Sequence, residues 1–191
     1  MMKRDECLRL LASRIRDEAV VATYQAAFDW MAMAPRDLNY LSIGAMGIAS
    51  SHALGLALGR PARRVIVLDG DGSLLMNLGS LATIAAAAPR NLAHLVCVNG
   101  VYEANGSHPL PGAAALDFAL IAKGAGLENA ATLATLAEFE ADLPQILAGE
   151  GPIFRALLVE AGASSPQDYA YIHGAETRNR FKAAFARPAT E

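Results

Sequence analysis

The chain has 191 residues, of which 53% are hydrophobic and 18% charged, and its formal net charge is -3. This length suits one well-buried domain rather than two, and the composition is typical of a globular chain, not a disordered one. The slightly acidic balance gives no support for nucleic-acid binding, and no apolar stretch is long enough to span a membrane. The two cysteines, Cys7 and Cys97, lack the spacing of a zinc or iron–sulfur site. Because the N-terminus also lacks the apolar core of a signal peptide, we expect a soluble protein in the reducing cytoplasm.

Hydrophobic periodicity predicts strands that alternate with helices along the chain. In chain order we expect a helix at 3–15, a strand at 19–24, a helix at 25–33, a strand at 38–43, a helix at 48–58, a strand at 64–68, a helix at 74–88, a strand at 94–98, a helix capped by Asp117 that runs to Lys123, a strand at 130–133, a helix at 137–147, a strand at 153–160 and a helix at 175–185. This alternation predicts an α/β fold, with a doubly wound, mainly parallel sheet flanked by helices. Residues 1–191 are interpreted as a single domain.

Polar residues outside this hydrophobic pattern are expected to be mostly solvated. The basic cluster of Arg60, Arg63 and Arg64 precedes a strand, so it should form an exposed turn at the end of the sheet where the strands begin. His94 is also expected at the surface. Residues 100–115 form a long loop rich in glycine and proline, which is typical of a functional segment.

Two of the predicted strands stop abruptly at small or polar residues. They read Val65-Ile-Val-Leu-Asp-Gly-Asp-Gly-Ser73 and Val96-Cys-Val-Asn-Gly-Val-Tyr-Glu103. A buried parallel strand that ends at a ligand crevice has this pattern. The amides of Gly72 and Ser73 would lie at a helix N-terminus, where anions bind. Asp71 and Asn99 offer oxygen ligands at the ends of two strands, which suits Mg²⁺ bridging a diphosphate.

Two better-known phosphate motifs do not fit the first segment. A dinucleotide-binding fingerprint needs a third glycine where this chain has Leu75, and an acidic residue near position 91, which is Asn91. The phosphate-binding loop of nucleotide hydrolases needs a lysine after its second glycine, and none follows Gly72.

The pairing of Gly70-Asp-Gly72 with Asn99 resembles the metal-binding motif of thiamine diphosphate enzymes. The segment Gly44-Ala-Met-Gly47 resembles the stretch that holds the aminopyrimidine ring in the decarboxylases of that family. The longer forms Gly44-x-Met-Gly-Ile-Ala-Ser-Ser and Asn99-Gly-Val-Tyr-Glu-Ala-Asn-Gly106 are most similar to the sulfopyruvate and phosphonopyruvate decarboxylases. The resemblance therefore implies a thiamine diphosphate-binding fold and a 2-oxo acid decarboxylase.

The resemblance also implies which residues hold the cofactor and its metal. Mg²⁺ would be bound by Asp71, by the side-chain oxygen of Asn99 and by the carbonyl of Val101. The carbonyl of Gly44 would accept a hydrogen bond from the 4′-amino group, and Met46 would be wedged between the two rings of the cofactor. The remaining cofactor contacts would come from Gly70, Gly72, Ser73, Asn99 and Tyr102, and the candidate catalytic residues are Met46, Glu103 and His108.

A complete enzyme of this family also has a pyrimidine-binding domain, whose glutamate protonates the cofactor ring. Nothing in this chain resembles that glutamate motif. The resemblance therefore implies the diphosphate-binding subunit of a split enzyme, inactive alone, that joins a pyrimidine-binding partner subunit in a hetero-oligomer and acts on sulfopyruvate- or phosphonopyruvate-like substrates. In isolation the chain could still form a homo-oligomer.

Two alternatives stay open. One is a carboligase subunit similar to acetolactate synthase, in which a second carbonyl compound takes the place of the proton. The other is a non-catalytic subunit that binds a cofactor or nucleotide and regulates a partner. The intact pair of Asp71 and Asn99 argues against a degenerate site.

Overall fold

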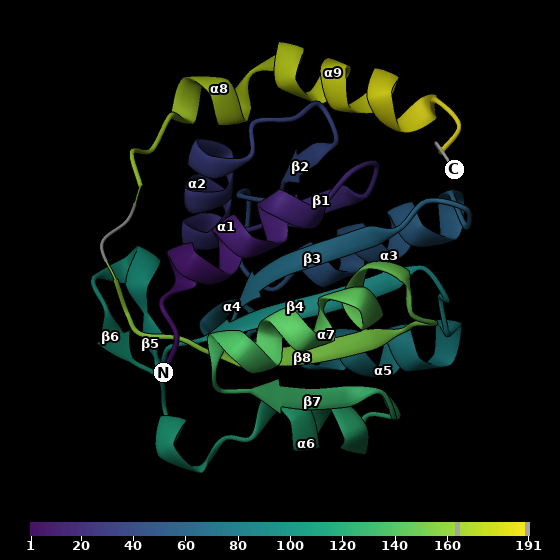
Figure 1. Cartoon of the computed structure of the whole chain (residues 1–191). Coiled ribbons are helices and arrows are strands. Elements are labelled where there is room, and N and C mark those ends of the chain that lie inside the picture. Colours follow the sequence, from purple (N-terminus) through teal and green to yellow (C-terminus); the bar gives the residue numbers. More distant parts are fainter. Residues whose placement is uncertain (163–164, 190–191) are drawn as a thin grey trace.

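A six-stranded parallel sheet forms the centre of the computed structural model, which describes residues 1–162 and 165–189 (Figure 1). The strand order is β2-β1-β3-β4-β8-β7, and every neighbouring pair is parallel. The strands are β1 (Ala19–Ala22), β2 (Asn39–Leu41), β3 (Val65–Gly70), β4 (Leu92–Val98), β7 (Ala130–Leu133) and β8 (Ile153–Leu158). The predicted doubly wound, mainly parallel sheet is therefore confirmed.

Helices cover both faces of the sheet, because successive residues of each strand point to opposite sides. In β3, Ile66 and Leu68 belong to one buried cluster, and Val65 and Val67 belong to the other. The first cluster packs against α1 (Arg4–Arg14), α2 (Tyr24–Met33) and α7 (Leu136–Ala148). The second packs against α3 (Ala49–Gly59), α5 (Gly79–Ala87) and α6 (Phe118–Gly124). Two further helices, α8 (Tyr169–His173) and α9 (Ala175–Ala186), cross the sheet at its β2 edge (Figure 1).

The helix predicted at 74–88 is wrong in one respect, since two helices occupy this region. The first is α4 (Asp71–Leu75), and α5 begins only at Gly79. Between them the backbone turns tightly, because Met76 and Asn77 donate to carbonyls three residues earlier. The Asn77 side chain donates to the carbonyl of Gly47 at 2.8 Å, so it anchors this turn to the loop before α3.

Three polar side chains expected in solvent are buried or half-buried, so that part of the prediction is wrong. Arg63 is only 3% exposed, because it donates to backbone carbonyls of Asp17 and of the C-terminal segment. Arg64 is half-buried and donates to the carbonyls that end α7. His94 is 1% exposed, and its Nε2 lies 3.1 Å from the carboxylate of Asp69 on the neighbouring strand. Each of these three side chains makes a hydrogen bond to a specific partner, as polar groups removed from solvent usually do.

Cys7 and Cys97 are free thiols in the core, as expected for Cys97 from its place in a buried strand. Burial raises the pKa of Cys7 to about 11 and that of Cys97 to about 12. Within the described ranges, none of the helices combines the length and apolar character needed to cross a membrane.

The connections of the sheet reverse direction between β1 and β3. From β1 the chain runs through α2 to the outer strand β2, whereas from β3 it runs through α4 and α5 to β4 on the other side. Because α2 and α5 cover opposite faces, a crevice opens at the carboxyl ends of these two strands, where ligands of such sheets bind. A small hairpin of β5 (Val101–Tyr102) and β6 (His108–Pro109) lies at this end, as does the N-terminus (Figure 1).

Candidate functional site

A pocket occupies this crevice and brings together most of the predicted site residues. Those that line it are Met46, Gly70, Asp71, Gly72, Ser73, Asn99, Val101, Tyr102 and Glu103. Two predicted residues lie elsewhere. Gly44 lines a neighbouring hollow together with His52, and His108 is exposed on β6.

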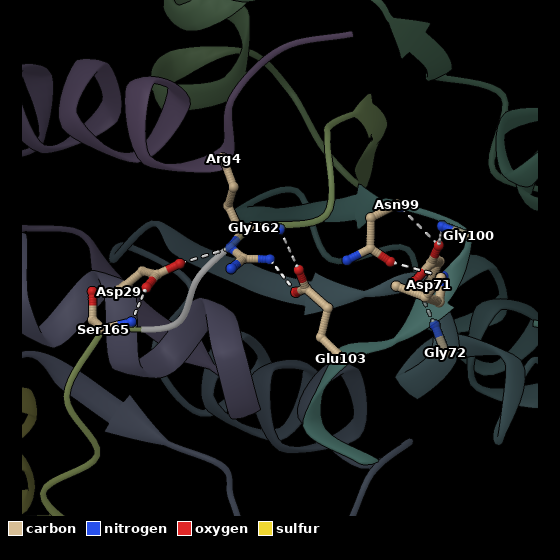
Figure 2. Close-up of polar contacts among 10 residues, drawn as sticks. Arg4, Asp29, Asp71, Gly72, Asn99, Gly100, Glu103, Gly162 and Ser165 are labelled. Carbon is tan, nitrogen blue, oxygen red and sulfur yellow. Dashed lines mark hydrogen bonds and ion pairs between the residues drawn. The ribbon is translucent and has the colours of Figure 1, made fainter. Parts of the chain in front are cut away.

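Asp71 is a buried carboxylate at the centre of the pocket wall, only 2% exposed. Its Oδ2 accepts hydrogen bonds from the amides of Asn99 at 2.9 Å and Gly100 at 2.7 Å, and its Oδ1 accepts from the amide of Gly72 at 2.8 Å (Figure 2). Burial raises the pKa of Asp71 above its usual value, against the effect of these three donors. No arginine, lysine or histidine of the described residues forms an ion pair with it. The pocket wall therefore carries a buried negative charge that a bound cation would neutralise.

The end of β4 places a second side-chain oxygen, that of Asn99, beside this carboxylate (Figure 2). Gly70 pairs with Cys97 in the sheet, so the residues that follow both strands are neighbours. The Asn99 Oδ1 atom accepts from the amide of Val101 at 3.0 Å, which orients the side chain within the loop. In the part of the chain that the structure describes, no cluster of three or more His, Cys, Asp or Glu forms a metal site. One carboxylate and one amide oxygen fit Mg²⁺ instead, because this ion keeps water and substrate phosphate among its ligands.

The loop before α3 is clamped so that Met46 is presented to the pocket. Gly47 adopts a positive φ of 84°, and its amide donates to the Ser73 hydroxyl at 3.0 Å. A side chain at Gly47 would also come within 3.1 Å of Asn77 Cβ, so glycine suits both the conformation and the close approach. Met46 is half-buried and lines the same pocket as Asp71.

Tyr102 packs directly on Gly72, the residue that follows Asp71. A Cβ atom at Gly72 would lie 2.5 Å from Cδ1 of Tyr102 and 3.2 Å from Cδ2 of Leu110. No side chain fits in that space. Gly72 is therefore needed here for a close approach between the end of β3 and the loop after β4.

We expect Gly72→Ala to displace the Tyr102 ring and to lower the free energy of unfolding by about 1–3 kcal/mol, as overpacking does. Tyr102→Ala in the same chain should remove most of that effect, because the clash is specific to the ring. Gly55→Ala is the matched control, since a Cβ there meets nothing within 4 Å inside α3. That control should stabilise the protein by about 0.5–1 kcal/mol. Denaturant unfolding of the parent, Gly72→Ala, Tyr102→Ala, their double variant and the Gly55→Ala control measures the coupling, and simple additivity would contradict the packing argument.

Sequence reasoning missed the contribution of β1 to this pocket. Thr23, Tyr24 and Gln25 line it at the N-terminus of α2, and Tyr24 adopts a positive φ of 44°. Such backbone strain in a residue other than glycine is characteristic of functional sites. The sequence does contain the pattern, because the apolar run of 19–22 stops at polar residues, as the run before Asp71 does. The predicted strand extended to residue 24, so this strand end was overlooked.

The sequence and fold place the chain in a known class. Residues 21–155 match the family described as "Thiamine pyrophosphate enzyme, C-terminal TPP binding domain", and the chain belongs to this family. Its fold is similar to that of benzoylformate decarboxylase from Polynucleobacter necessarius, with a TM-score of 0.68, 21% identity, and coverage of 85% of this chain and 34% of that one.

Its relatives identify the branch within that class as the one of sulfopyruvate and phosphonopyruvate decarboxylases, as the two sequence segments indicated. The chain is 36% identical to sulfopyruvate decarboxylase subunit beta of Methanothermobacter thermautotrophicus over 163 residues, which are 85% of this chain and 84% of that one. It is 38% identical over 181 residues to phosphonopyruvate decarboxylase of Streptomyces viridochromogenes. That match covers 94% of this chain but only 45% of the relative, so the chain spans less than half the length of that protein.

Proposed function

We propose that this chain is the diphosphate- and Mg²⁺-binding subunit of a split thiamine diphosphate-dependent decarboxylase. Its substrate would be a three-carbon 2-oxo acid with a sulfonate or phosphonate group at C3. The observation that carries the proposal is the buried carboxylate of Asp71 beside Asn99, which forms no ion pair with a described residue and lies in the crevice at the ends of β1 and β3. The similarity to the sulfopyruvate decarboxylase subunit beta, which has nearly the same extent, supports the split arrangement.

The chain's own residues would bind the metal and the diphosphate. Asp71, the side-chain oxygen of Asn99 and the carbonyl of Val101 would hold Mg²⁺. Gly70, Gly72, Ser73 and Tyr102 would surround the diphosphate, in the pocket that they already line. The charges of the pocket favour a bound cation. The carboxylates of Asp69, Asp71 and Glu103 line it, and Arg4 is the only arginine or lysine among the described lining residues.

The cofactor rings and the acid–base chemistry would be served by different segments. Met46 from the pocket and the carbonyl of Gly44 from the neighbouring hollow would support the ring system of the cofactor. When bound, thiamine diphosphate supplies the electron sink for loss of CO₂ from a 2-oxo acid. Glu103 and His108 are the candidate proton-transfer groups on the loop. Glu103 is held by Arg4 and by the amide of Gly162, so its use in proton transfer would require release of this ion pair.

A partner subunit would complete the site. The segments 38–59 and 72–89 contain no Asp, Glu, Lys or Arg. The first includes β2 and α3, and the second includes α5 and all of α4 but its first residue. Leu58 and Met76 are large apolar side chains exposed on these segments. Such an uncharged surface suits docking of a pyrimidine-binding subunit. We also propose that the assembly works in the cytoplasm, where the two free thiols would stay reduced.

Calorimetric titration of the purified chain with thiamine diphosphate, with Mg²⁺ or with a chelator, tests the cofactor assignment. We expect binding only with Mg²⁺, and no binding of thiamine, which lacks the diphosphate. Equal affinity in chelator would contradict the metal assignment. Product analysis of the complete enzyme then separates the alternatives, since a decarboxylase releases an aldehyde and a carboligase releases a larger hydroxy-oxo acid.

Met46→Ala should lower turnover of the assembled enzyme far more than it lowers cofactor affinity, because the diphosphate anchor is untouched. Steady-state kinetics and calorimetry measure the two effects. Met33→Ala is the control, since Met33 is a half-buried methionine of α2 outside the pocket. If Met46 served only as core, the variant would lose up to about 2–5 kcal/mol of stability while activity per folded molecule stayed normal.

A further inference from the structure

Building on this proposed function, we propose that Arg4 is a positioning residue of the cofactor site. Through Glu103 it holds the loop that carries Asn99 and Val101 against α2, so that the oxygen ligands of the loop stay beside Asp71.

The Arg4 side chain joins two elements that border the pocket. It extends from α1, is only 5% exposed, and lines the pocket itself. Its Nε donates to Oδ2 of Asp29 on α2 at 2.7 Å, and its Nη1 donates to Oε2 of Glu103 (Figure 2). A guanidinium presents its donors in one rigid plane, so binding both carboxylates fixes Glu103 relative to α2.

Backbone amides from the segment after β8 complete this cluster. The amide of Gly162 donates to Oε1 of Glu103 at 2.8 Å, and the amide of Ser165 donates to Oδ1 of Asp29 at 3.0 Å. All four carboxylate oxygens therefore have a donor. A buried ion-pair network defines a geometry when its members are satisfied in this way.

The segment 99–103, which follows β4, is thus fixed at both ends. At its start, the amides of Asn99 and Gly100 donate to the Asp71 carboxylate. At its end, Glu103 is bound to Arg4. The predicted metal ligands of the loop lie between these two points. Without Arg4, Glu103 would lose the ion pair that links it to α2, and the charged contact left at this segment would be the Asp71 carboxylate, which must also serve the metal.

Positioning and simple electrostatics make different predictions for the same variants. Removing Arg4 makes the pocket more negative, so charge alone would tighten Mg²⁺ binding. Glu103→Gln makes the pocket less negative, so charge alone would weaken it. If the ion pair positions the loop, both changes weaken Mg²⁺ binding. Arg4→Lys is the sharpest case, because it keeps the charge but loses the planar fork.

The experiment uses the full chain as Arg4→Lys, Arg4→Gln, Glu103→Gln and the Arg4→Gln/Glu103→Gln double variant. Arg9→Gln is the matched control, since Arg9 forms an exposed ion pair with Asp5 on the same helix. The measured quantity is the Mg²⁺ concentration that half-saturates thiamine diphosphate binding. We expect this concentration to rise about tenfold in each single variant and to stay unchanged in the control. In the double variant it should rise no further than in the single variant that binds Mg²⁺ less tightly. Opposite shifts for Arg4→Gln and Glu103→Gln would overturn the inference, as would an unchanged value in Arg4→Lys.

A second readout needs no ligand. In metal-free protein, the amides of Asn99 and Gly100 should exchange hydrogen faster in Arg4→Lys and Glu103→Gln than in the parent and control, while amides within β4 keep their protection. If the parent chain fails to bind cofactor, the proposed function is wrong, and the exchange rates still decide the position of the loop. If the parent binds cofactor while both readouts are unchanged in the variants, the proposed function stands and the inference fails.

Discussion

Replacing Asp71 with alanine should weaken Mg²⁺-dependent binding of thiamine diphosphate by at least about 100-fold. Loss of a residue that only orients a metal ligand typically lowers metal affinity by 10–100-fold, so loss of a direct ligand should reach the upper end or exceed it. The reason is local, because the other proposed ligands, the Asn99 side chain and the Val101 carbonyl, are neutral. The remaining carboxylates of the pocket, those of Asp69 and Glu103, are already paired with His94 and Arg4. Calorimetry at fixed Mg²⁺ and a Mg²⁺ titration at fixed cofactor both measure this effect.

The control must separate lost binding from lost folding. Asp117→Ala removes an aspartate that caps α6 by accepting from the amide of Leu120, outside the pocket. It should lower the free energy of unfolding by about 1 kcal/mol and leave cofactor affinity unchanged. Asp71→Ala should instead lose cofactor affinity while the protein remains folded. If Asp71→Ala kept the parent affinity, the metal site would have been assigned to the wrong residue.

Local sequence patterns predicted the strands because each buried run of apolar residues is read within a few positions. The strand at 130–133 was predicted at its observed bounds, and the cap of α6 by Asp117 is confirmed. The break between α4 and α5 could not be read in this way. It depends on Asn77 binding Gly47, thirty residues earlier in the chain. His94 was misplaced for a similar reason, since its partner Asp69 lies on another strand.

The residues of the candidate site also fall into two groups, those that local sequence predicts and those that only the complete fold brings together. Asp71 and Asn99 each follow a recognisable strand, so local sequence was enough to predict that they meet. Thr23 and Tyr24 join them only because β1 lies beside β3, and strand order is a property of the whole sheet. The pair of Arg4 and Glu103 joins residues 99 positions apart, with no pattern at either end to indicate it. Long-range ion pairs of this kind become visible only when the packing of α1 and α2 is known.

The partner subunit should produce the second large effect. We expect the chain alone to bind thiamine diphosphate with Mg²⁺ but to release CO₂ from 2-oxo acids no faster than a cofactor blank. In the proposed assembly, a glutamate of the partner would move the proton that activates the cofactor ring. The carboxylates that line the pocket here are already engaged. Asp69 is paired with His94, Asp71 accepts from the β4 loop, and Glu103 is held by Arg4.

Adding a separately encoded pyrimidine-binding subunit should therefore raise decarboxylation of a C3-anionic, three-carbon 2-oxo acid by at least about 100-fold, the scale of positioned acid–base catalysis. The same mixture made with Asp71→Ala should remain at the blank, which ties the gain to this pocket rather than to the partner. Self-association of the isolated chain would not affect the argument, because a second copy brings the same residues and no new proton donor. Decarboxylation by the chain alone, in a preparation free of partner by mass spectrometry, would show that the acid–base group lies within these residues. The split-subunit proposal would then be wrong, and Glu103, released from Arg4, would be the first residue to replace.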